Sequence, residues 1–524
     1  MIPEKCRVLG SLVLFAACVH PGTLHVPEYT EQKQNLPKAI YFVLVDRFSS
    51  LTGAVSGAPH DFHGGDLWGV LKNLDWIQGM GFDAIWLSPV WETRKEPFGG
   101  YGAFHGYWVT NPTRVDPGFG GEAALAALSE EMERRNMRLV LDMVYNHTAW
   151  DSPLRTQHPD WFHPAASITD WSDATQVQTH EVHGLPDLAQ ENPDVYQYLR
   201  QVSLDRIQTT HPAGFRIDAV KHLDPGFLPK LARDILFVAP DFFLLGEIFD
   251  GNPKSLSEAW KYSDLTSVFD FPLYYALIDF FCHDAAPGRL ATMLAQDFRY
   301  AHPERLVTFL DNHDLPRIAS ACNQDVARIE SAWKLLFSLR GVPSMTYGTE
   351  VGLLGASEPE NRGDMLFLEA DPADRYEKIR DALTARSPLM AYGQSWIAAL
   401  GEDSVDIGQR YQGETQVVRV TRKSVQVVPA TLALPSVRSV TVTGEPGWAL
   451  VGSHPSLGDW SPENARALDG NQLTVDLPAG AVYAVKWVRR EGAGWGWEAG
   501  DNRYIFVPPG TGELSVALPG AHLE

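Results

Sequence analysis

The stretch Gly214-Phe215-Arg216-Ile217-Asp218-Ala219-Val220-Lys221-His222 predicts a short buried strand that ends in charged residues. Phe215 and Ile217 are apolar and alternate with Arg216 and Asp218, as residues on opposite faces of a strand do. An arginine so close to a carboxyl group favours its ionised form, which makes Asp218 a candidate nucleophile. An ion pair at the end of a strand explains this stretch equally well, so the surrounding sequence has to decide.

Short apolar runs of the same kind alternate with helical stretches from Lys38 onward. This alternation predicts βα units and a parallel sheet. Because eight such runs are present, we expect an α/β fold with a closed (β/α)8 barrel rather than an open doubly wound sheet. The expected strands are 40–45, 84–87, 139–144, 215–217, 242–245, 267–269, 306–310 and 342–347.

Acidic residues lie at the ends of several of these runs, among them Asp142, Asp218, Glu247 and Asp314. The carboxyl ends of barrel strands converge on one face, where barrel enzymes build their active sites, so we expect Asp218, Glu247 and Asp314 to meet there. Each residue has a structural alternative, such as a barrel ion pair for Asp142 or a surface acid for Glu247. Such alternatives would have to hold at several strand ends at once, which favours a functional site.

Four short segments resemble, in family order, the motifs of the α-amylase family of glycoside hydrolases. Segments 81–89, 185–188 and 341–350 resemble its auxiliary motifs, and the resemblance extends over about residues 38–388. It implies a TIM barrel with an inserted domain B and a short antiparallel β C-domain. The four segments are Asp142-Met143-Val144-Tyr145-Asn146-His147, Gly214–His222, Gly246-Glu247 and Phe309-Leu310-Asp311-Asn312-His313-Asp314.

The resemblance implies the roles of the three acids. Asp218 is then the nucleophile, Glu247 the general acid/base, and Asp314 the carboxylate that stabilises the oxocarbenium-like transition state. A retaining glycosidase needs one carboxylate that attacks the anomeric carbon and one protonated acid at the leaving oxygen, so this assignment is chemically complete.

The resemblance also implies a set of residues that bind the sugar. Tyr107 is expected to form the stacking floor of subsite −1, and Lys221 with His222 to reach the leaving-group side. The family often has an aspartate four residues before its conserved arginine in the loop after the last strand, but Glu358 stands there before Arg362. The expected substrate-binding residues are His105, Tyr107, Trp108, His147, Arg216, Lys221, His222, His313, Glu358 and Arg362.

The connection at about 148–192 is long for a barrel loop, which predicts a lid or a small inserted domain. In the family this domain B holds Ca²⁺ against the barrel. By position, the ligands carried over to this chain are the Asn146 side chain, the Asp187 carboxylate and the His222 carbonyl. Oxygen donors of this kind suit Ca²⁺. An insertion held by packing alone is the alternative.

The tail resembles the starch-binding module found at the C-termini of glucoamylases and cyclodextrin glycosyltransferases, with segments 450–460, 477–480, 485–489 and 497–503 carrying the resemblance. It implies a β-sandwich in which Trp460 and Trp497 form a two-ring platform for an α-glucan, helped by Lys486 and Asn502. Two buried sandwich tryptophans are the alternative. Because no tyrosine stands near Ala449 or in segment 469–473, we expect the module's second site to be absent.

The N-terminus predicts export. Lys5 and Arg7 precede an apolar run over 8–19 that is too short for a transmembrane helix and is laid out like a secretory signal. Its end resembles a bacterial lipobox, so that lipid on Cys18 would anchor a cell-surface lipoprotein, with ordinary secretion as the alternative. Cys282 and Cys322 are too few for a disulfide framework and have no metal-ligand spacing, so we expect both to be free and buried.

Composition narrows the partners. A net charge of −22 repels nucleic acid and anionic membranes, whereas 16 Trp and 17 Tyr offer many faces for sugar rings, although most of these would be expected in the core. We therefore expect a monomer that binds starch, maltooligosaccharides and related α-glucans. The predicted parts are a signal (1–18), the barrel (38–392), a C-domain (393–439) and a starch-binding module (440–524).

The leading functional hypothesis is an exported, endo-acting, retaining α-1,4-glucan hydrolase. A transglycosylase that forms cyclodextrins or maltooligosaccharides is the near alternative, but little sequence remains before Val440 for the extra immunoglobulin-like domain of cyclodextrin-forming enzymes. A non-catalytic surface glycan receptor is the third hypothesis. The presence of all three acids argues against a receptor.

Overall fold

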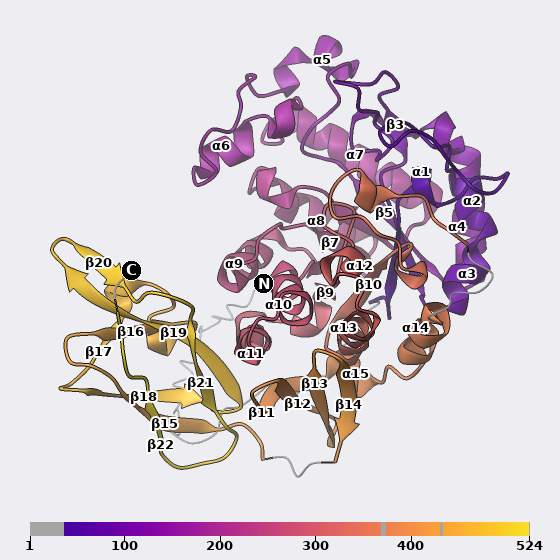
Figure 1. Cartoon of the computed structure of the whole chain (residues 1–524). Coiled ribbons are helices and arrows are strands. Elements are labelled where there is room, and N and C mark those ends of the chain that lie inside the picture. Colours follow the sequence, from indigo (N-terminus) through magenta and orange to yellow (C-terminus); the bar gives the residue numbers. More distant parts are fainter. Residues whose placement is uncertain (1–35, 368–373, 430–432, 523–524) are drawn as a thin grey trace, which may run out of the picture.

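The computed structural model describes residues 36–367, 374–429 and 433–522. It consists of a barrel, a small antiparallel sheet and a C-terminal β module (Figure 1). The expected signal and Cys18 lie outside the described residues. Among the described residues, no helix is both long and apolar enough to cross a membrane.

The barrel contains eight parallel strands in the order β8-β7-β6-β5-β2-β1-β10-β9. A parallel bridge between Phe269 and Val307 links the two end strands and nearly closes the ring. Seven of the strands are buried throughout, because the sheet is covered on both faces. This confirms the expected TIM barrel. The strands are β1 (Ile40–Val43), β2 (Ala84–Leu87), β5 (Arg138–Met143), β6 (Gly214–Ile217), β7 (Phe243–Gly246), β8 (Ser267–Val268), β9 (Val307–Thr308) and β10 (Val342–Thr346).

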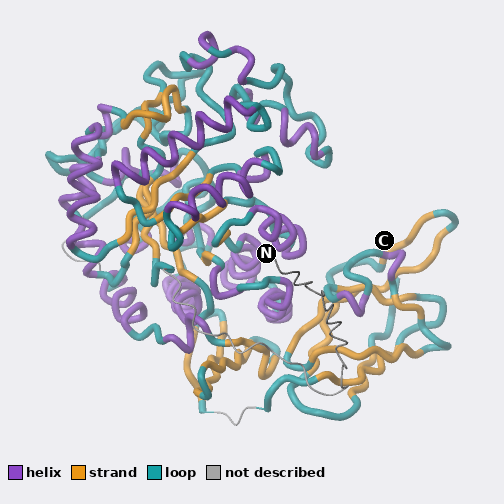
Figure 2. Tube along the Cα trace, turned by 180° about the vertical axis from the view of Figure 1, so that it is seen from behind, coloured by secondary structure: helices purple, strands orange, loops and turns teal. Residues whose placement is uncertain are grey.

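Helices surround the strands, as Figure 2 shows, and the sequence explains where they begin and which face they bury. Asn252 caps α9 by accepting from the N–H groups of Lys254 and Ser255, and Pro253 opens the helix. In α8, Phe227, Leu231 and Ile235 recur at helical spacing and are buried. The longer helices are α2 (Leu67–Lys72), α3 (Leu74–Gly79), α4 (Gly121–Arg134), α7 (Pro193–Thr210), α8 (Phe227–Val238), α9 (Pro253–Ser263), α10 (Phe271–Cys282), α11 (Pro287–Leu294), α13 (Val326–Ser338) and α14 (Arg375–Thr384).

The segment between β5 and α7 forms the expected insertion and contains only the short helices α5 (Leu154–Gln157) and α6 (Ala174–Thr179) with two 3-10 turns. Isolated β-bridges connect parts of the insertion with one another and with the segment that follows β5. One of them joins His147 to Asp187. The hairpin of β3 (Trp91–Thr93) and β4 (Val109–Val115) lies beside it, because Ala149 donates to the carbonyl of Val109.

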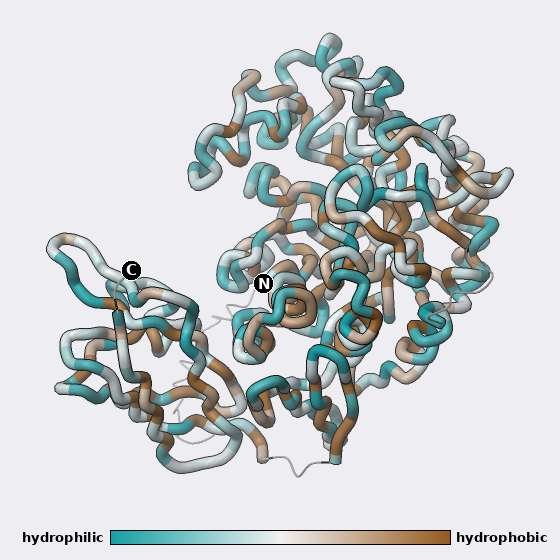
Figure 3. The backbone as a smooth tube through the Cα atoms, in the orientation of Figure 1, coloured by the Kyte–Doolittle hydropathy of each residue, from teal (hydrophilic) through white to brown (hydrophobic). Residues whose placement is uncertain are grey.

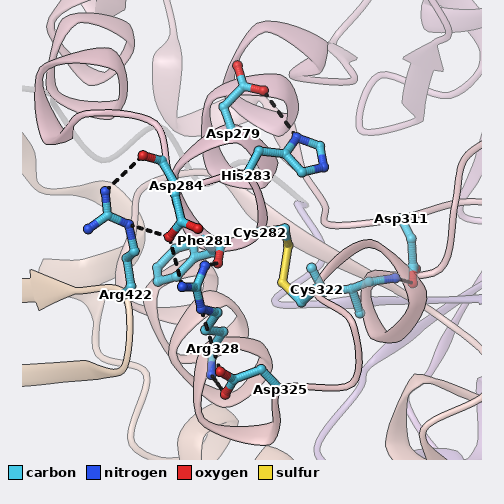
Figure 4. The surroundings of a disulfide bond; sticks show 11 residues. Asp279, Phe281, Cys282, His283, Asp284, Asp311, Cys322, Asp325, Arg328 and Arg422 are labelled. Carbon is cyan, nitrogen blue, oxygen red and sulfur yellow. Dashed lines mark hydrogen bonds and ion pairs between the residues drawn. A yellow bond between two sulfur atoms is a disulfide. The ribbon is translucent and has the colours of Figure 1, made fainter.

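One expectation was wrong. Cys282 and Cys322 are not free but form a disulfide (Figure 4). Cys282 ends α10, and Cys322 follows the short helix α12 (Ile318–Ala321), so the packing of neighbouring barrel units brings the two Cα atoms within 4.3 Å. A separation of 40 residues gives no sign of this pairing in the sequence.

After the barrel, four consecutive strands form an antiparallel sheet whose buried face, including Ile397 and Ile407, joins the barrel's hydrophobic core. They are β11 (Gln394–Leu400), β12 (Ser404–Tyr411), β13 (Glu414–Thr421) and β14 (Ser424–Val428). Figure 3 shows hydrophobic stretches gathered on the strands and hydrophilic ones on the outer loops.

The C-terminal module has its own core around the fully buried Trp487. One sheet pairs β18 (Gln472–Pro478), β15 (Val437–Thr443) and β22 (Leu514–Ala517), so the first strand begins slightly before the expected residue 440. The other sheet contains β17 (Arg466–Ala467), β16 (Ala449–Gly452), β19 (Ala481–Glu491), β20 (Gly494–Trp497) and β21 (Arg503–Val507).

Candidate active site

The expected catalytic acids come together at the carboxyl ends of the barrel strands. Asp218 directly follows β6, Glu247 directly follows β7, and Asp314 lies in the loop after β9. Asp218 and Glu247 are each only 8% exposed. Parallel strands therefore bring together residues that are far apart in the sequence.

Arg216 connects the acids. Its Nη1 lies 2.7 Å from Oδ1 of Asp218 and 2.9 Å from Oδ1 of Asp142, and its Nη2 lies 2.8 Å from Oε1 of Glu247. The guanidinium is buried and packs over the ring of Trp86. One cation thus faces three carboxyl groups, so ionising all three would leave uncompensated negative charge in a poorly solvated place.

The acids differ in pKa for identifiable reasons. Burial raises the pKa of Glu247 to about 8, and the nearby Asp218 and Asp314 add to the rise, while Arg216 opposes it. Burial also raises the pKa of Asp142. Burial alone would raise the pKa of Asp314 as well, but neighbouring cationic groups, among them the Arg362 guanidinium 3.0 Å away, hold it below its usual value. The site therefore pairs a protonated acid with an ionised one, as acid/base chemistry requires.

Tyr107 and His313 form a flat aromatic surface beside the acids. Their rings are parallel within 5°, with centroids 5.2 Å apart, and the Tyr107 hydroxyl donates to Asp142 over 2.9 Å. Burial lowers the pKa of His313 to about 3, so its ring is neutral. His147 contacts the carbonyl of Tyr107, and the Nδ1 atoms of His147 and His313 are buried with no partner among the described residues. Neither Nδ1 atom is therefore used by the protein's own described residues.

His105 and Trp108, which flank Tyr107 in the sequence, pack beside the aromatic surface. His105 stacks on Tyr107, and its Nδ1 accepts from the backbone N–H of Tyr107 over 3.0 Å. Trp108 packs edge-on against His105, with ring centroids 5.2 Å apart. His105 therefore contacts Tyr107 directly, and Trp108 packs against His105.

Glu358 does reach Arg362, although it replaces the usual aspartate. The two form an ion pair, and the Tyr101 hydroxyl donates to Glu358. The other arm of Arg362 lies 3.0 Å from Oδ1 of Asp314. Glu358 is thus connected to a candidate catalytic acid through a single arginine.

Lys221 and His222 lie in the short turn after β6, on the rim. The Lys221 Nζ atom is 3.2 Å from Oδ2 of Asp250, in the loop after Glu247. His222 Nδ1 lies 2.8 Å from the carbonyl of Val177 in the insertion, and the 62% exposed Trp171 stands edge-on to its ring. These residues join the insertion to the barrel at one side of the site.

Two of the three expected metal ligands, Asn146 and Asp187, have the chemistry of a cation site. Asn146 Oδ1 and Asp187 Oδ1 are buried without a hydrogen-bond partner among the described residues, which suits a cation that takes oxygen donors. The second oxygen of Asp187 is 2.6 Å from Nδ1 of His163. Within the described ranges, no group of three or more His, Cys, Asp or Glu side chains could hold a metal, so such a site would need amide and carbonyl oxygens.

In the C-terminal module, Trp460 and Trp497 pack against the same small cluster of Ala449, Val451 and Val488 and are only partly buried. Both rings therefore keep an accessible part. Lys486 donates to the carbonyl of Glu498 in the neighbouring segment, and Asn502 is exposed.

The sequence analysis missed some residues of the site. Asp142 was expected at a strand end, with a barrel ion pair as its structural alternative, but not as a site residue; the structure shows that ion pair with Arg216 and a hydrogen bond from Tyr107. Tyr101 and Trp171 lie outside every motif. Only their aromatic character in long barrel loops could have drawn attention to them.

Comparisons with known proteins agree with this geometry. The family description "Alpha amylase, catalytic domain" matches residues 42–390, and "Starch binding domain" matches residues 437–516. The chain is 31% identical to Alpha-amylase 2 of Schwanniomyces occidentalis over 65% of this chain and 70% of that protein. It is 32% identical to an alpha-amylase of Saccharomycopsis fibuligera over 75% of this chain and 82% of that protein.

A solved structure adds to the sequence matches. The alpha-amylase of Geobacillus thermoleovorans, in complex with acarbose, superimposes with a TM-score of 0.69 at 31% identity, covering 87% of this chain and 98% of that one. The chain therefore belongs to the α-amylase family of glycoside hydrolases and ends in a starch-binding domain.

Proposed function

We propose that this protein is an exported, endo-acting α-amylase that hydrolyses α-1,4-glucosidic bonds of starch with retention of anomeric configuration. The observation that carries the proposal is the pair Asp218 and Glu247 on the single guanidinium of Arg216. Carboxyl groups held by one guanidinium favour the separation of about 5–5.5 Å of retaining enzymes over the wider one that accommodates a water molecule.

In this mechanism Asp218 attacks the anomeric carbon while Glu247 gives its proton to the leaving oxygen. The pKa of about 8 keeps Glu247 protonated at neutral pH, as a general acid requires. A covalent glycosyl–Asp218 ester forms as the glycosidic bond breaks. Glu247, now a carboxylate, then takes a proton from water, whose oxygen attacks the anomeric carbon and releases Asp218.

The remaining residues bind and stabilise the reacting sugar. Asp314 stays ionised beside His313 and Arg362, so its charge stabilises the positive charge that develops on the sugar ring. The ring stacks on Tyr107, and the imidazoles of His147 and His313, which lie against Tyr107, bind its hydroxyls. Lys221 and His222, on the rim, contact the leaving-group side, and Glu358 and Arg362 the opposite side.

We assign a calcium site to Asn146, Asp187 and the carbonyl of His222. The unpaired buried oxygens of Asn146 and Asp187 support it. When bound, Ca²⁺ would supply no chemistry to the reaction but would tie the insertion to the barrel. Two residues of the insertion, Val177 and the exposed Trp171, contact His222 on the rim. A calcium ion that joins the insertion to the barrel would therefore fix one side of the site.

The starch-binding domain is assigned to adsorption on insoluble starch through Trp460 and Trp497, with Lys486 and Asn502 at their edges. The partly exposed rings of the two tryptophans support this assignment. Adsorption raises the local substrate concentration without adding a contact to the transition state.

Export is supported by the disulfide between Cys282 and Cys322, because such bonds persist in oxidising compartments. We keep both routes predicted from the N-terminus, a lipoprotein acylated on Cys18 and a secreted enzyme. Cys18→Ser moves a lipoprotein from the membrane fraction to the soluble fraction and leaves a secreted enzyme where it was.

NMR of the first product tests the reaction. Digestion of a soluble maltooligosaccharide should release the α-anomer first, and a β-anomer would overturn the assignment of Asp218 as nucleophile. A time course on soluble starch should show reducing ends appearing faster than small sugars. Cyclic products without net reducing-sugar release would identify a transglycosylase instead.

A further inference from the structure

The starch-binding domain lies directly against the barrel. In Figure 1 its strands β19 and β21 are on the side that faces α11. The contact has an apolar part and a charged part, which lie on different elements of the barrel. Together they decide where the tryptophan platform sits.

The apolar part centres on Gly288 in α11. The ring of Tyr504 from β21 covers this glycine so closely that a Cβ atom there would lie 2.5 Å from the ring. Val482 from β19 is fully buried and joins the same core cluster as the barrel residues. Gly288 does not have a positive φ, so its backbone accepts a side chain and only the domain contact forbids one.

The charged part centres on Asp459. Its Oδ1 lies 2.5 Å from Nη2 of Arg299, which is 9% exposed and also donates to the carbonyl of Ser453 over 3.0 Å. Its Oδ2 lies 3.1 Å from Nζ of Lys254. Two barrel cations therefore hold one carboxylate of the starch-binding domain, and a partly buried pair of this kind is more strongly coupled than an exposed one.

Asp459 directly precedes Trp460, and both have a left-handed backbone, with φ of 50° and 62°. Aspartate tolerates this conformation, but it is uncommon for a bulky residue such as tryptophan and needs support from the surroundings. Here the backbone N–H of Trp460 donates to the carbonyl of Gly452 over 3.0 Å, and the Asp459 side chain is fixed by the barrel. The barrel thus helps to set the direction of the tryptophan.

The charged contact also involves a helix that begins close to Glu247. Lys254 is in the first turn of α9, the helix that follows β7 and Glu247. Asp250, the partner of Lys221 on the rim, lies in the same loop. Asp459 is therefore tied to the start of α9 through Lys254, and to the segment that leads into β9 through Arg299.

We infer that Asp459, held by Arg299 and Lys254, is a positioning residue that fixes the Trp460 platform on the barrel near the start of α9, while Tyr504 on Gly288 locks the docked domain. The inference rests on the proposed function of Trp460 in starch binding. It adds that the domain is a fixed part of the catalytic unit rather than a tethered adsorption device. A fixed domain presents a bound chain at one place, whereas a tethered one samples many.

The test introduces a side chain that blocks the domain contact, here called the wedge, and then a second change that removes the clash. Gly288→Leu should push Tyr504 away and undock the domain, and adding Tyr504→Ala should make room for the new side chain and restore docking. Spin labels at the exposed positions Lys72 and Gln472 report the domain separation. We expect a broad distance distribution for the wedge and a narrow one for the wild type and the double variant.

Starch digestion is measured on the same variants. The wedge should slow digestion of raw starch granules about tenfold per adsorbed molecule, while turnover of a short soluble maltooligosaccharide stays unchanged. Asp459→Asn should slow granule digestion in the same direction. Asp476→Asn, a matched change on an exposed residue of β18, should not. Arg299→Gln combined with Asp459→Asn should be no worse than either change alone.

The outcomes separate the inference from the proposed function. A narrow label distance in the wedge variant, or granule digestion as fast as in the wild type, would overturn fixed docking while leaving starch binding by Trp460 intact. Trp460→Ala with undiminished granule adsorption would instead overturn the proposed role of Trp460, and the label distances would still report whether the domains are docked.

Discussion

The proposed barrel site (Asp218, Glu247 and Asp314 with Arg216) and the proposed module site (Trp460 and Trp497) differ in how they would act on the same substrate. The barrel site buries charge, and its side chains are fixed by ion pairs of 2.7–2.8 Å. The module site is built from partly exposed indole rings on a small apolar cluster. Bond cleavage needs groups whose charge is tuned by desolvation, whereas adhesion needs only flat apolar surface in reach of a granule.

Removing the nucleophile should have the largest effect. Asp218→Asn keeps the shape of the side chain but is a poor nucleophile, so kcat should fall by about 10⁴-fold. Raw-starch adsorption should be unchanged, because the module site is untouched. Kinetics and a granule sedimentation assay on the same protein check both halves, with Asp250→Asn on the rim as the control. An active Asp218→Asn protein would mean that another carboxylate attacks the substrate.

Glu247→Gln should rank second, with a loss of about 10²–10⁴-fold on starch. The loss should be much smaller with a maltosyl fluoride, whose leaving group needs no proton. In the wild type, kcat should decline as the pH rises through the Glu247 pKa of about 8. The variant's alkaline decline should disappear. An equal loss on both substrates would contradict the acid role.

The same residue makes stability depend on pH. The pKa of Glu247 is raised from 4.5 to about 8 on folding, so the folded protein retains a proton that the unfolded chain has released over that range. Its contribution is complete below pH 4.5 and is lost as the pH rises through about 8. Melting curves of the wild type and Glu247→Gln should therefore converge at low pH and separate as the pH rises.

Calcium removal should affect the barrel and spare the module. A metal present at 100 times its Kd stabilises the folded state by about 2.7 kcal/mol, so exhaustive chelation should lower the Tm and added Ca²⁺ should restore it. Asn146→Ala should remove this response. Binding of a cyclic maltooligosaccharide to the starch-binding domain should stay the same after chelation. If the Tm is the same with and without the chelator, the calcium site is wrong.

Truncating the platform should have the smallest effect, and only on solid substrate. Trp460→Ala with Trp497→Ala should weaken adsorption to raw starch by about 1–3 kcal/mol per ring, since each indole buries the C–H face of a sugar. Turnover of short soluble maltooligosaccharides should stay at the wild-type value. An equal loss on both substrates would show that the two sites are not separable.

The sequence was informative where one residue pattern determines the structure. Runs such as 84–87 have to be buried strands, and the segments around Asp218 and Glu247 could be aligned with a known family, so the barrel and the convergence of its acids were predictable. The roles of those acids remain predictions that the experiments above address. The family assignment of the tail was likewise carried by short segments around Trp460 and Trp497.

What could not be predicted depends on contacts between distant segments. The disulfide joins residues whose neighbours in sequence carry no pairing signal. In the sequence, Asp459 has no feature that distinguishes it from a surface acid. Its partners Arg299 and Lys254 are evident only in the structure. Gly288 looks like a poor helix residue, and only the ring of Tyr504 explains it. Tertiary neighbours, not local propensity, decide these positions.

The disulfide between Cys282 and Cys322 encloses β9 and Asp314 in one covalent ring. A protease that cuts the chain once between the two cysteines therefore opens the ring but cannot divide the molecule. The two pieces stay joined, with their ends held near their native places. On a denaturing gel the nicked enzyme would run as two fragments only after reduction. A single cut in the segment that carries the candidate catalytic acid Asp314 would therefore leave both pieces of the enzyme covalently joined.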